Sequence, residues 1–593
     1  MLYDYCQNCG VKSTNLSVLK ANDFPENCNN IQDGDIFVCE RCKNCLNESK
    51  DSLEKILFSD HKNKLILGGP GTGKTFLFRH VIENLPENTD ILVITFINNL
   101  VEDLEKQFSK ISDRDIKVRT LHGFCKGFLL HEIHQYEYFP ELPQIIENDV
   151  SLLELNFKEK NISREFTNLK KEGEEIKFYL SRSDYYNSVG HDDTVYRVFS
   201  YLSENNEAIP KYSQVIVDEY QDFNLLESSL IELIAKRNMI IIAGDDDQAL
   251  YRFKSASPEF IRNLYQNQQF KHFFLPFSRR CPSVLVEAAN AFISIAKKRG
   301  LLHGRIEKEF KCYWPDKFLD SIKHPFIFLG KFSADSVVSK YIKERIISII
   351  KEENIQPSEK EEPEFLIIGP PRISHYLKEA NETLVKDNRL DQNIFEIEYK
   401  KESKRLSINE GYEFIRKNTK SNIGWRIIMY KDPVDPDLKK NKEIIRKSLN
   451  GESIVNLLPE SYINKHRERA DKLSLEETKI PDEAPDKKIK IKLTTYLGAK
   501  GLSANHVFVL GLENGVFPKD PNNISDDEVC QFIVLLTRAR KSLNILVSKR
   551  FDRIIRRSVD RLSSFVSMIP RQFLKIRDNI KASDLSPLRQ DLI

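Results

Sequence analysis

The chain has 593 residues, too many for one hydrophobic core, which predicts roughly three to five compact units. Hydrophobic residues make up 40% and charged residues 30%, a balance that excludes a disordered chain, and no apolar run approaches the ~18 residues of a membrane span. A net charge of +2 gives no global attraction to nucleic acid, so any such binding needs a local surface. The first residues show no basic segment leading into an apolar stretch, so we expect a cytoplasmic protein with no membrane partner.

Six of the ten cysteines lie within the first 45 residues, in two CxxC pairs separated by residues 10–38. This spacing predicts a zinc ribbon in which four thiolates hold one Zn²⁺. The predicted ligands are Cys6, Cys9, Cys39 and Cys42, with Cys28 or Cys45 as alternates. An iron–sulfur cluster or no metal stays open as an alternative. The ribbon would be a docking face for nucleic acid or a partner protein, or a stability cap, and the polar stretch 46–52 is expected to connect it to the rest.

Beyond the ribbon, short apolar runs indicate buried strands that alternate with helical patterns. These runs lie at 64–67, 91–95, 215–217, 239–243, 325–329, 365–369, 490–495, 506–511 and 543–547. Such alternation predicts an α/β protein with parallel sheets covered on both faces. The expected units are a ribbon at 1–46, a first α/β domain at 47–125 and 211–272 with a helical insertion at 126–210, a second at 273–375 and 488–575 with an insertion at 376–487, and a C-terminal tail at 576–593.

The sequence GGPGTGKT at 68–75 follows the first of these strands and opens a helix, the context of a phosphate-binding loop. Glycines let backbone N–H groups surround phosphates, Lys74 places a charge at the β and γ oxygens, and Thr75 offers its hydroxyl to Mg²⁺. The helix dipole points at the same phosphates. The residues expected to bind ATP are Gly68, Gly69, Pro70, Gly71, Thr72, Gly73, Lys74 and Thr75.

The sequence VIVDEYQD at 215–222 is a strand that ends in acidic residues. Asp218 would hold Mg²⁺ together with Thr75, and Glu219 would position or deprotonate the attacking water.

These motifs, with GDDDQALYRF at 244–253, resemble motifs II and III of the UvrD/PcrA/Rep-like superfamily 1 DNA helicases. Further segments are similar to motif Ia at 91–100, Ib at 120–124, IV at 275–282, V at 493–503 and VI at 534–540. The resemblance covers about residues 46–572. It implies two RecA-like P-loop motor domains that hydrolyse ATP in the cleft between them and move 3′ to 5′ along single-stranded DNA, including duplex with an overhang.

Carried over by position, Gln248 is similar to a glutamine that senses the γ-phosphate, and Arg280 and Arg538 to two arginines that reach it from the second motor domain. Aromatic residues of the family stack on bases, and nearby polar residues contact the DNA backbone. The matching positions here are Phe96, His122, Tyr251, Phe253 and Lys254.

The base and ribose end of the nucleotide site departs from the family pattern. Residues 46–57 contain no glutamine, Arg279 stands where a base-stacking tyrosine is usual, and Ser503 stands where a glutamate is usual. Arg279 can still stack on a base through its guanidinium plane. The hypothesis that follows is a motor that tolerates several nucleoside triphosphates.

The leading interpretation is an ATP-driven single-stranded DNA translocase or helicase, in DNA repair or in defence against foreign DNA. An alternative is a nucleotide-gated module that binds DNA or a partner protein with little unwinding. Retention of Glu219, Gln248, Arg280 and Arg538 favours turnover over gating. An RNA motor is a third interpretation, since only the family precedent separates DNA from RNA.

Overall fold

The structure is a computed structural model of the chain. It describes residues 6, 16–20, 35–96, 98–109, 114–157, 162–169, 173–251, 255–359, 362–371, 374–399, 406–473, 487–548, 550–552, 557–559, 561–585, 588 and 592. Within these ranges, every helix is too short or too polar to cross a bilayer.

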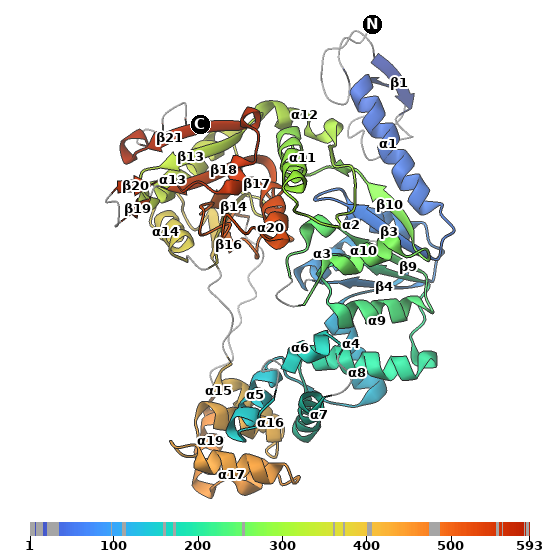
Figure 1. The fold of residues 1–593 in the computed structure, drawn as a ribbon, viewed down its shortest axis with the longest axis vertical. Coiled ribbons are helices and arrows are strands. Elements are labelled where there is room, and N and C mark those ends of the chain that lie inside the picture. The colour runs from blue at the N-terminus through green and yellow to red at the C-terminus, as the bar shows by residue number, and fades with distance from the viewer. Residues whose placement is uncertain are drawn as a thin grey trace.

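A six-stranded parallel sheet forms the core of the first domain (Figure 1). Its strands in spatial order are β10 (Lys271–Leu275), β3 (Asn63–Gly68), β9 (Ile240–Gly244), β8 (Gln214–Val217), β4 (Asp90–Thr95) and β5 (Asp115–Thr120). The four central strands are almost fully buried because helices cover both faces. The edge strand β10 carries this domain to Leu275, past the predicted boundary at 272.

Alternate residues of these strands pack against different sets of helices. On one face, Ile66 and Val93 join a core with α1 (Glu40–Leu57), α2 (Lys74–Glu83) and α3 (Asn98–Phe108). On the other face, Leu65 and Leu92 pack in the core that includes α4 (Leu121–Phe128), α8 (His191–Glu204), α9 (Leu225–Ala235) and α10 (Pro258–Gln266). The sheet thereby holds the carboxyl ends of β3, β9 and β8, in that order, next to one another along one edge.

A seven-stranded parallel sheet forms the second domain. Its spatial order is β15 (Phe395–Tyr399), β16 (Ile489–Thr495), β14 (Phe365–Gly369), β17 (Ala504–Leu510), β18 (Ala539–Ser548), β13 (Ile327–Phe332) and β21 (Leu574–Ile580). One face is covered by α11 (Ser283–Lys298), α20 (Asp526–Leu536) and α21 (Ser564–Ser567), and the other by α13 (Asp335–Glu353) and α14 (Ser374–Val385). The predicted α/β class with two parallel-sheet motor domains is confirmed.

The described part of the N-terminal unit is a two-stranded antiparallel sheet followed at once by a helix. Strand β1 (Leu16–Lys20) pairs with β2 (Asp35–Cys39), and α1 begins at the next residue. Helix α1 runs without a break from the second cysteine pair to Leu57, so the predicted connection at 46–52 is helical. The helix connects the N-terminal unit directly to the first domain, because Ile56 at its far end lies in that domain's core.

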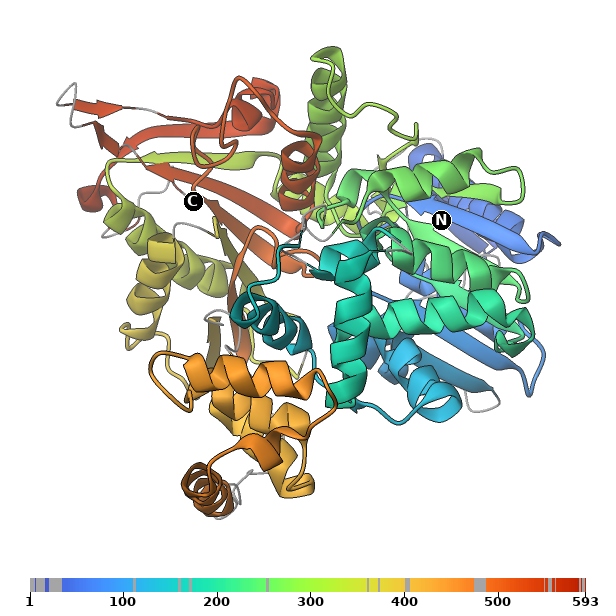
Figure 2. The same ribbon diagram turned by 60° about the horizontal axis from the view of Figure 1, so that its bottom comes forward.

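The two helical insertions lie together at one end of the molecule (Figures 1 and 2). The first contains α5 (Leu142–Leu152), α6 (Ile162–Thr167), α7 (Glu174–Tyr186) and a short pairing of β6 (Glu137–Tyr138) with β7 (Ser188–Val189). The second contains α15 (Ile408–Lys417), α16 (Asn422–Lys431), α17 (Lys439–Ser448), α18 (Ile454–Leu457) and α19 (Glu460–Leu473). The predicted start of the second insertion at 376 is too early, because α14 and β15 pack in the second domain and its sheet.

A buried ion network joins the two insertions. Asp149 of α5 accepts from Arg182 Nε of α7 at 3.0 Å and from Arg426 Nε of α16 at 2.8 Å. The Asp149 and Arg426 side chains are 0% exposed. The ring of Phe139 also packs edge-on against Phe414, with 5.7 Å between centroids. Shared charge and shared apolar packing make the insertions one helical body.

Removing the charge of Asp149 tests this joint. Asp149→Asn is expected to lower the stability of the insertions by about 3–5 kcal/mol, because Arg182 and Arg426 would be left buried without their carboxylate. Thermal unfolding followed by circular dichroism, with limited proteolysis to locate the opened segment, measures the change. The control is Glu154→Ala, which removes an exposed ion pair with Lys442 between the same insertions and should leave unfolding unchanged. Equal behaviour of the two variants would contradict a joint that depends on the buried pair.

Candidate functional site

The phosphate-binding loop lies between β3 and α2, at the carboxyl end of the first sheet. Gly71 and Gly73 have φ angles of 69° and 85°, which L side chains avoid. A Cβ atom on Gly71 would lie 2.3 Å from Cβ of Arg280, so only glycine fits where the second domain covers the loop. Lys74 is buried, and its Nζ donates to the Gly68 carbonyl at 3.1 Å. The loop is therefore already formed around the place where phosphates would bind.

The second domain touches this loop directly through the short strand β11 (Phe277–Ser278) and the residue that follows it. Ser278 Oγ donates to the Pro70 carbonyl at 2.9 Å, and the Arg279 N–H donates to the Gly71 carbonyl at 2.9 Å. Movement of the second domain would therefore move the cover of the phosphate site.

Asp218 and Glu219 follow β8 beside the loop. The Glu219 N–H donates to Asp218 Oδ1 at 2.9 Å, and Glu219 has a φ of 52°, a left-handed conformation that is uncommon outside glycine. Burial, and then the charge of Glu219, raises the pKa of Asp218 to about 7. Burial would also raise the pKa of Glu219, but Lys74 and Lys500 outweigh it and the pKa is lowered. This arrangement suits a Mg²⁺ ligand at Asp218 and an ionised base at Glu219.

A chain of hydrogen bonds connects Glu219 to the second domain. Gln221 Nε2 donates to Glu219 Oε2 at 2.5 Å, and Gln221 Oε1 accepts from the Asp245 N–H at 2.9 Å. Gln248 Nε2 donates to Asp245 Oδ2 at 2.7 Å. Arg538 Nη2 donates to Gln248 Oε1 at 3.3 Å. The structure thus brings the predicted base, γ-phosphate sensor and one arginine into a single network.

The two predicted arginines lie close to each other behind the phosphate loop. Burial lowers the pKa of Arg280, and burial together with the charge of Arg280 lowers the pKa of Arg538 to about 9. Neighbouring buried cations repel each other, and a triphosphate placed between Lys74 and this pair would remove that repulsion. The repulsion between the two arginines therefore favours the binding of a polyanion between them and Lys74.

Three consecutive buried carboxylates, Asp245, Asp246 and Asp247, follow β9 and lie within reach of a common ion. Lys308 Nζ lies 2.9, 2.5 and 2.9 Å from their carboxylate oxygens in turn. Arg305 binds both oxygens of Asp247 at 2.8 Å. The cluster is therefore compensated by cations of the second domain, and its chemistry is that of an ion-pair network. Sequence reasoning missed Lys308 and Arg305, because neither belongs to a recognisable motif.

Lys500 makes a second buried bridge between the domains. Its Nζ donates to Asp222 Oδ1 at 2.6 Å and also to the Gln248 carbonyl. Burial outweighs this partner, so the pKa of Asp222 is raised to about 7. The same Nζ lies 5.5 Å from the ring centroid of Tyr251. Lys500 therefore touches the nucleotide network on one side and a predicted DNA-stacking residue on the other.

The structure brings two of the predicted DNA contacts together and places a third, His122, on α4. The rings of Phe96 and Tyr251 lie 5.0 Å apart between centroids, and Phe96 also packs edge-on against Phe223 at 5.6 Å. His122 lies on α4, where its Nδ1 is 3.7 Å from Glu227 Oε1. Phe253 and Lys254 fall outside the described residues. The described part of the track is an aromatic pair directly behind the motif II and III residues.

Arg279 marks the base end of the site. Its guanidinium lies 4.3 Å from the ring centroid of Tyr313, 5.4 Å from that of Phe76 and 3.8 Å from an Asp316 oxygen. A base would be contacted here by a guanidinium and an aromatic ring, which accept any base because every base has a π-face. Phe76, Tyr313 and Asp316 also lie here, and sequence reasoning missed them, because Phe76 is on α2 whereas Tyr313 and Asp316 are at the start of a helix more than 200 residues later.

The ribose end differs from the family pattern in charge as well. Ser503 Oγ accepts from Arg540 Nε at 3.2 Å and Nη2 at 3.0 Å, and Arg540 also pairs with Glu362. A cation therefore lies where the resemblance would place an acidic side chain.

The N-terminal cysteines converge in part. The thiols of Cys6, Cys39 and Cys42 lie within 4.8 Å of one another. The predicted fourth ligand Cys9 and the alternate Cys28 fall outside the described residues. The other alternate, Cys45, is not in this group of thiols, and its thiol interacts with the backbone of Trp314. Three soft thiolate donors at one point fit a zinc ion.

Comparisons with known proteins agree with this geometry. A family model described as an AAA domain matches residues 54–254. The chain is 22% identical to a probable DNA helicase II homolog of Mycoplasma genitalium, over 81% of this chain and 82% of that protein. It is 24% identical to the ATP-dependent DNA helicase Rep of Buchnera aphidicola subsp. Schizaphis graminum, over 81% and 90%. A shorter match, 25% identical, covers 39% of this chain and 38% of the DNA helicase II of Haemophilus influenzae.

Two parallel sheets, a formed phosphate loop and arginines from the facing domain define a P-loop nucleoside triphosphatase with two motor domains. Two of these matches cover 81% of this chain, well beyond the phosphate loop. The family match and the likeness to relatives named as DNA helicases support a UvrD-like superfamily 1 helicase, as the motifs predicted.

The base end generates a prediction about nucleotide choice. The kcat/KM for ATP should exceed those for GTP, CTP and UTP by less than about a hundredfold, because a guanidinium and a ring read no hydrogen-bonding edge. Steady-state hydrolysis with the four nucleotides measures the ratios. Arg279→Ala should raise KM for all four by about tenfold. A larger preference of the wild type for ATP, or a rise in KM of Arg279→Ala that is confined to ATP, would show that the adenine is recognised specifically.

Proposed function

We propose that this protein is an ATP-driven motor that moves 3′ to 5′ along single-stranded DNA and opens duplex from a single-stranded overhang. The observation that carries the proposal is the continuous network from Glu219 through Gln248 to Arg538, which spans the cleft between the two motor domains. The polarity and the nucleic acid rest on the motif resemblance and on the relatives named as DNA helicases.

Coupling of hydrolysis to movement requires that the nucleotide network reach the strand. Lys500 supplies that connection, since it contacts Asp222 and the Gln248 carbonyl and lies over Tyr251. Phosphate release would weaken the attraction between the domains, and the Phe96–Tyr251 pair would shift with them. Stacking on aromatic rings is tolerant of sequence, as a translocating motor needs.

The alternative function is a nucleotide-gated module that binds DNA or a partner protein. A gate needs nucleotide binding but no general base. The ionised Glu219, fixed by Gln221 beside the magnesium-binding Asp218, is costly to keep in a buried site unless turnover uses it. This favours a hydrolase, with DNA repair or defence against foreign DNA as the proposed settings.

The decisive experiment measures ATP hydrolysis with and without single-stranded DNA. We expect stimulation by single-stranded DNA that weakens as salt is raised. Glu219→Gln should lower hydrolysis by about 10²–10⁴-fold while ATP binding is retained, because the attacking water loses its base. Glu232→Gln, a neutralised carboxylate on the exposed side of α9, is the control and should behave as wild type. Absence of DNA stimulation would contradict the motor, and activity in the Glu219 variant would contradict the assigned base.

We further propose that the N-terminal cysteines bind one Zn²⁺ through Cys6, Cys39, Cys42 and the predicted fourth ligand Cys9. Metal analysis of the purified chain should find one zinc ion and no visible absorption, because a d¹⁰ ion has no colour and an iron–sulfur cluster does. Cys39→Ser should lose the zinc, whereas Cys45→Ser should keep it, because that thiol faces Trp314. If the Cys45→Ser variant lost its zinc, Cys45 would be the fourth ligand in place of Cys9.

A further inference from the structure

The N-terminal cysteine unit packs against the second motor domain close to the base end of the nucleotide site. Val38, Cys42 and Leu46 share a buried cluster with Phe277 of β11 and Tyr313. Trp314 and Phe318 of α12 (Trp314–Lys323) pack on the same cluster. The cysteine pair on α1 is therefore part of a core that it shares with the motor.

Polar contacts hold the same surfaces together. The Arg41 guanidinium lies 3.4 Å from the ring centroid of Trp314. Lys311 is the first residue of β12 (Lys311–Cys312). Its Nζ lies 2.9 Å from Glu48 of α1 and 2.7 Å from Glu309. The first turns of α1 are thus held to the segment that leads into α12.

That segment also positions Arg279. Tyr313 is 0% exposed, with Cys42 and Leu46 in its cluster and Arg279 against its ring at 4.3 Å. Asp316, one turn into α12, is the carboxylate partner of Arg279 at 3.8 Å. A continuous series of contacts therefore runs from the cysteine site through Tyr313 to the residue that would stack on the base.

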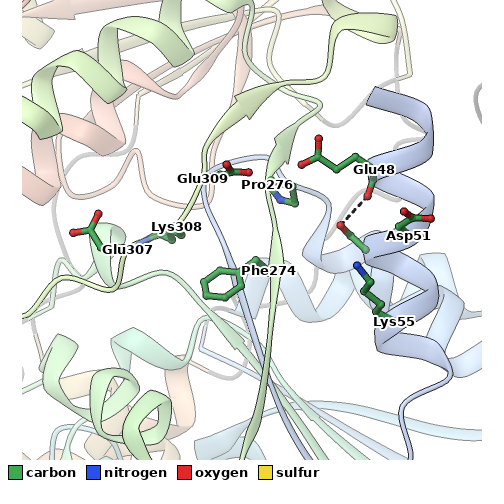
Figure 3. Close-up of a pocket in the computed structure, with 9 residues that line it drawn as sticks. Glu48, Asp51, Lys55, Phe274, Pro276, Glu307, Lys308 and Glu309 are labelled. Carbon is green, nitrogen blue, oxygen red and sulfur yellow. Dashed lines mark hydrogen bonds between the residues drawn. The ribbon is translucent and has the colours of Figure 1, made fainter. Parts of the chain in front are cut away.

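A groove opens beside the middle of α1, next to the Glu48–Lys311 ion pair. The groove, of about 570 Å³, lies between α1 and β10 and is lined by Glu48, Asp51, Lys55, Phe274 and Pro276 among others (Figure 3). In Figure 3, the Glu48 side chain extends from α1 toward Pro276. Beyond the groove, Leu53 and Leu57 pack in the same core as Phe273 and Leu275 of β10, so α1 is held both at its cysteine end and at its far end.

We propose that the cysteine unit is a metal-held brace for the base end of the nucleotide site, so that metal occupancy sets the affinity for the nucleoside and leaves the phosphate half unchanged. The proposal rests on the proposed zinc site and on nucleotide binding at the phosphate loop. Metal loss would free the first turn of α1, release Tyr313 and let Arg279 leave the base. Lys74 and its loop would be unaffected, because β3 and α2 fix them within the core of the first sheet.

Equilibrium binding of ATP and of inorganic tripolyphosphate to the full-length protein tests the brace, because only ATP carries a base. Cys39→Ser removes the metal, whereas Trp314→Ala keeps the metal and removes the ring that Arg41 and the cluster contact. Each variant should bind ATP about tenfold more weakly, the loss of roughly one stacking contact, and bind tripolyphosphate as wild type does. Leu319→Ala, on the same helix but 75% exposed, is the control and should change neither.

Three outcomes would overturn the brace. ATP binding unchanged in Trp314→Ala would show that the docked surfaces do not reach the base. Equal weakening of ATP binding and tripolyphosphate binding would show a general loss of structure. Removal of zinc from the wild-type protein by a chelator checks the same point without a substitution. A purified wild-type protein that contains no metal would contradict a metal-held brace. ATP hydrolysis with single-stranded DNA tests the proposed motor separately.

Discussion

Compensation of buried charge across the cleft between the two sheets is the constraint on which the rest of this structure depends. The first domain places four carboxylates in the cleft, at Asp222 and at Asp245 to Asp247. The second domain supplies Lys308, Arg305 and Lys500 to meet them. Each partner alone would carry a large desolvation cost, so the charges hold the domains in register. The arginines at the γ-phosphate position are the exception, because their anion would arrive with the nucleotide.

This division of charge explains how a nucleotide can drive movement in such a scaffold. The ion pairs attract the domains to each other with or without a nucleotide, and Arg280 and Arg538 would respond to what occupies the phosphate loop. The hydrogen-bond chain through Gln221 and Gln248 makes the general base sensitive to the same closure. Lys500 extends the network to Tyr251, so a change at the phosphate reaches the aromatic pair over a few contacts.

The additions to the two sheets are each held by a different kind of joint. The insertions share the buried Asp149 pair, which costs much to break and therefore favours one arrangement. The N-terminal unit shares an apolar cluster with Tyr313 and has too little core of its own, so metal binding would supply its folding energy. One addition is thus stabilised by charge inside the protein, and the other would depend on the proposed zinc ion.

The sequence by itself determined the nine central strands and the phosphate loop, because each is encoded locally. Central strands are buried on both faces and show as apolar runs, whereas the edge strands β5, β10, β15 and β21 are half exposed, and none of the four was predicted. Only the tertiary structure decided which residues meet. Phe76 meets Arg279, and Lys308 meets Asp246, only after segments far apart in the chain come together, and the residue types carry no signal before that.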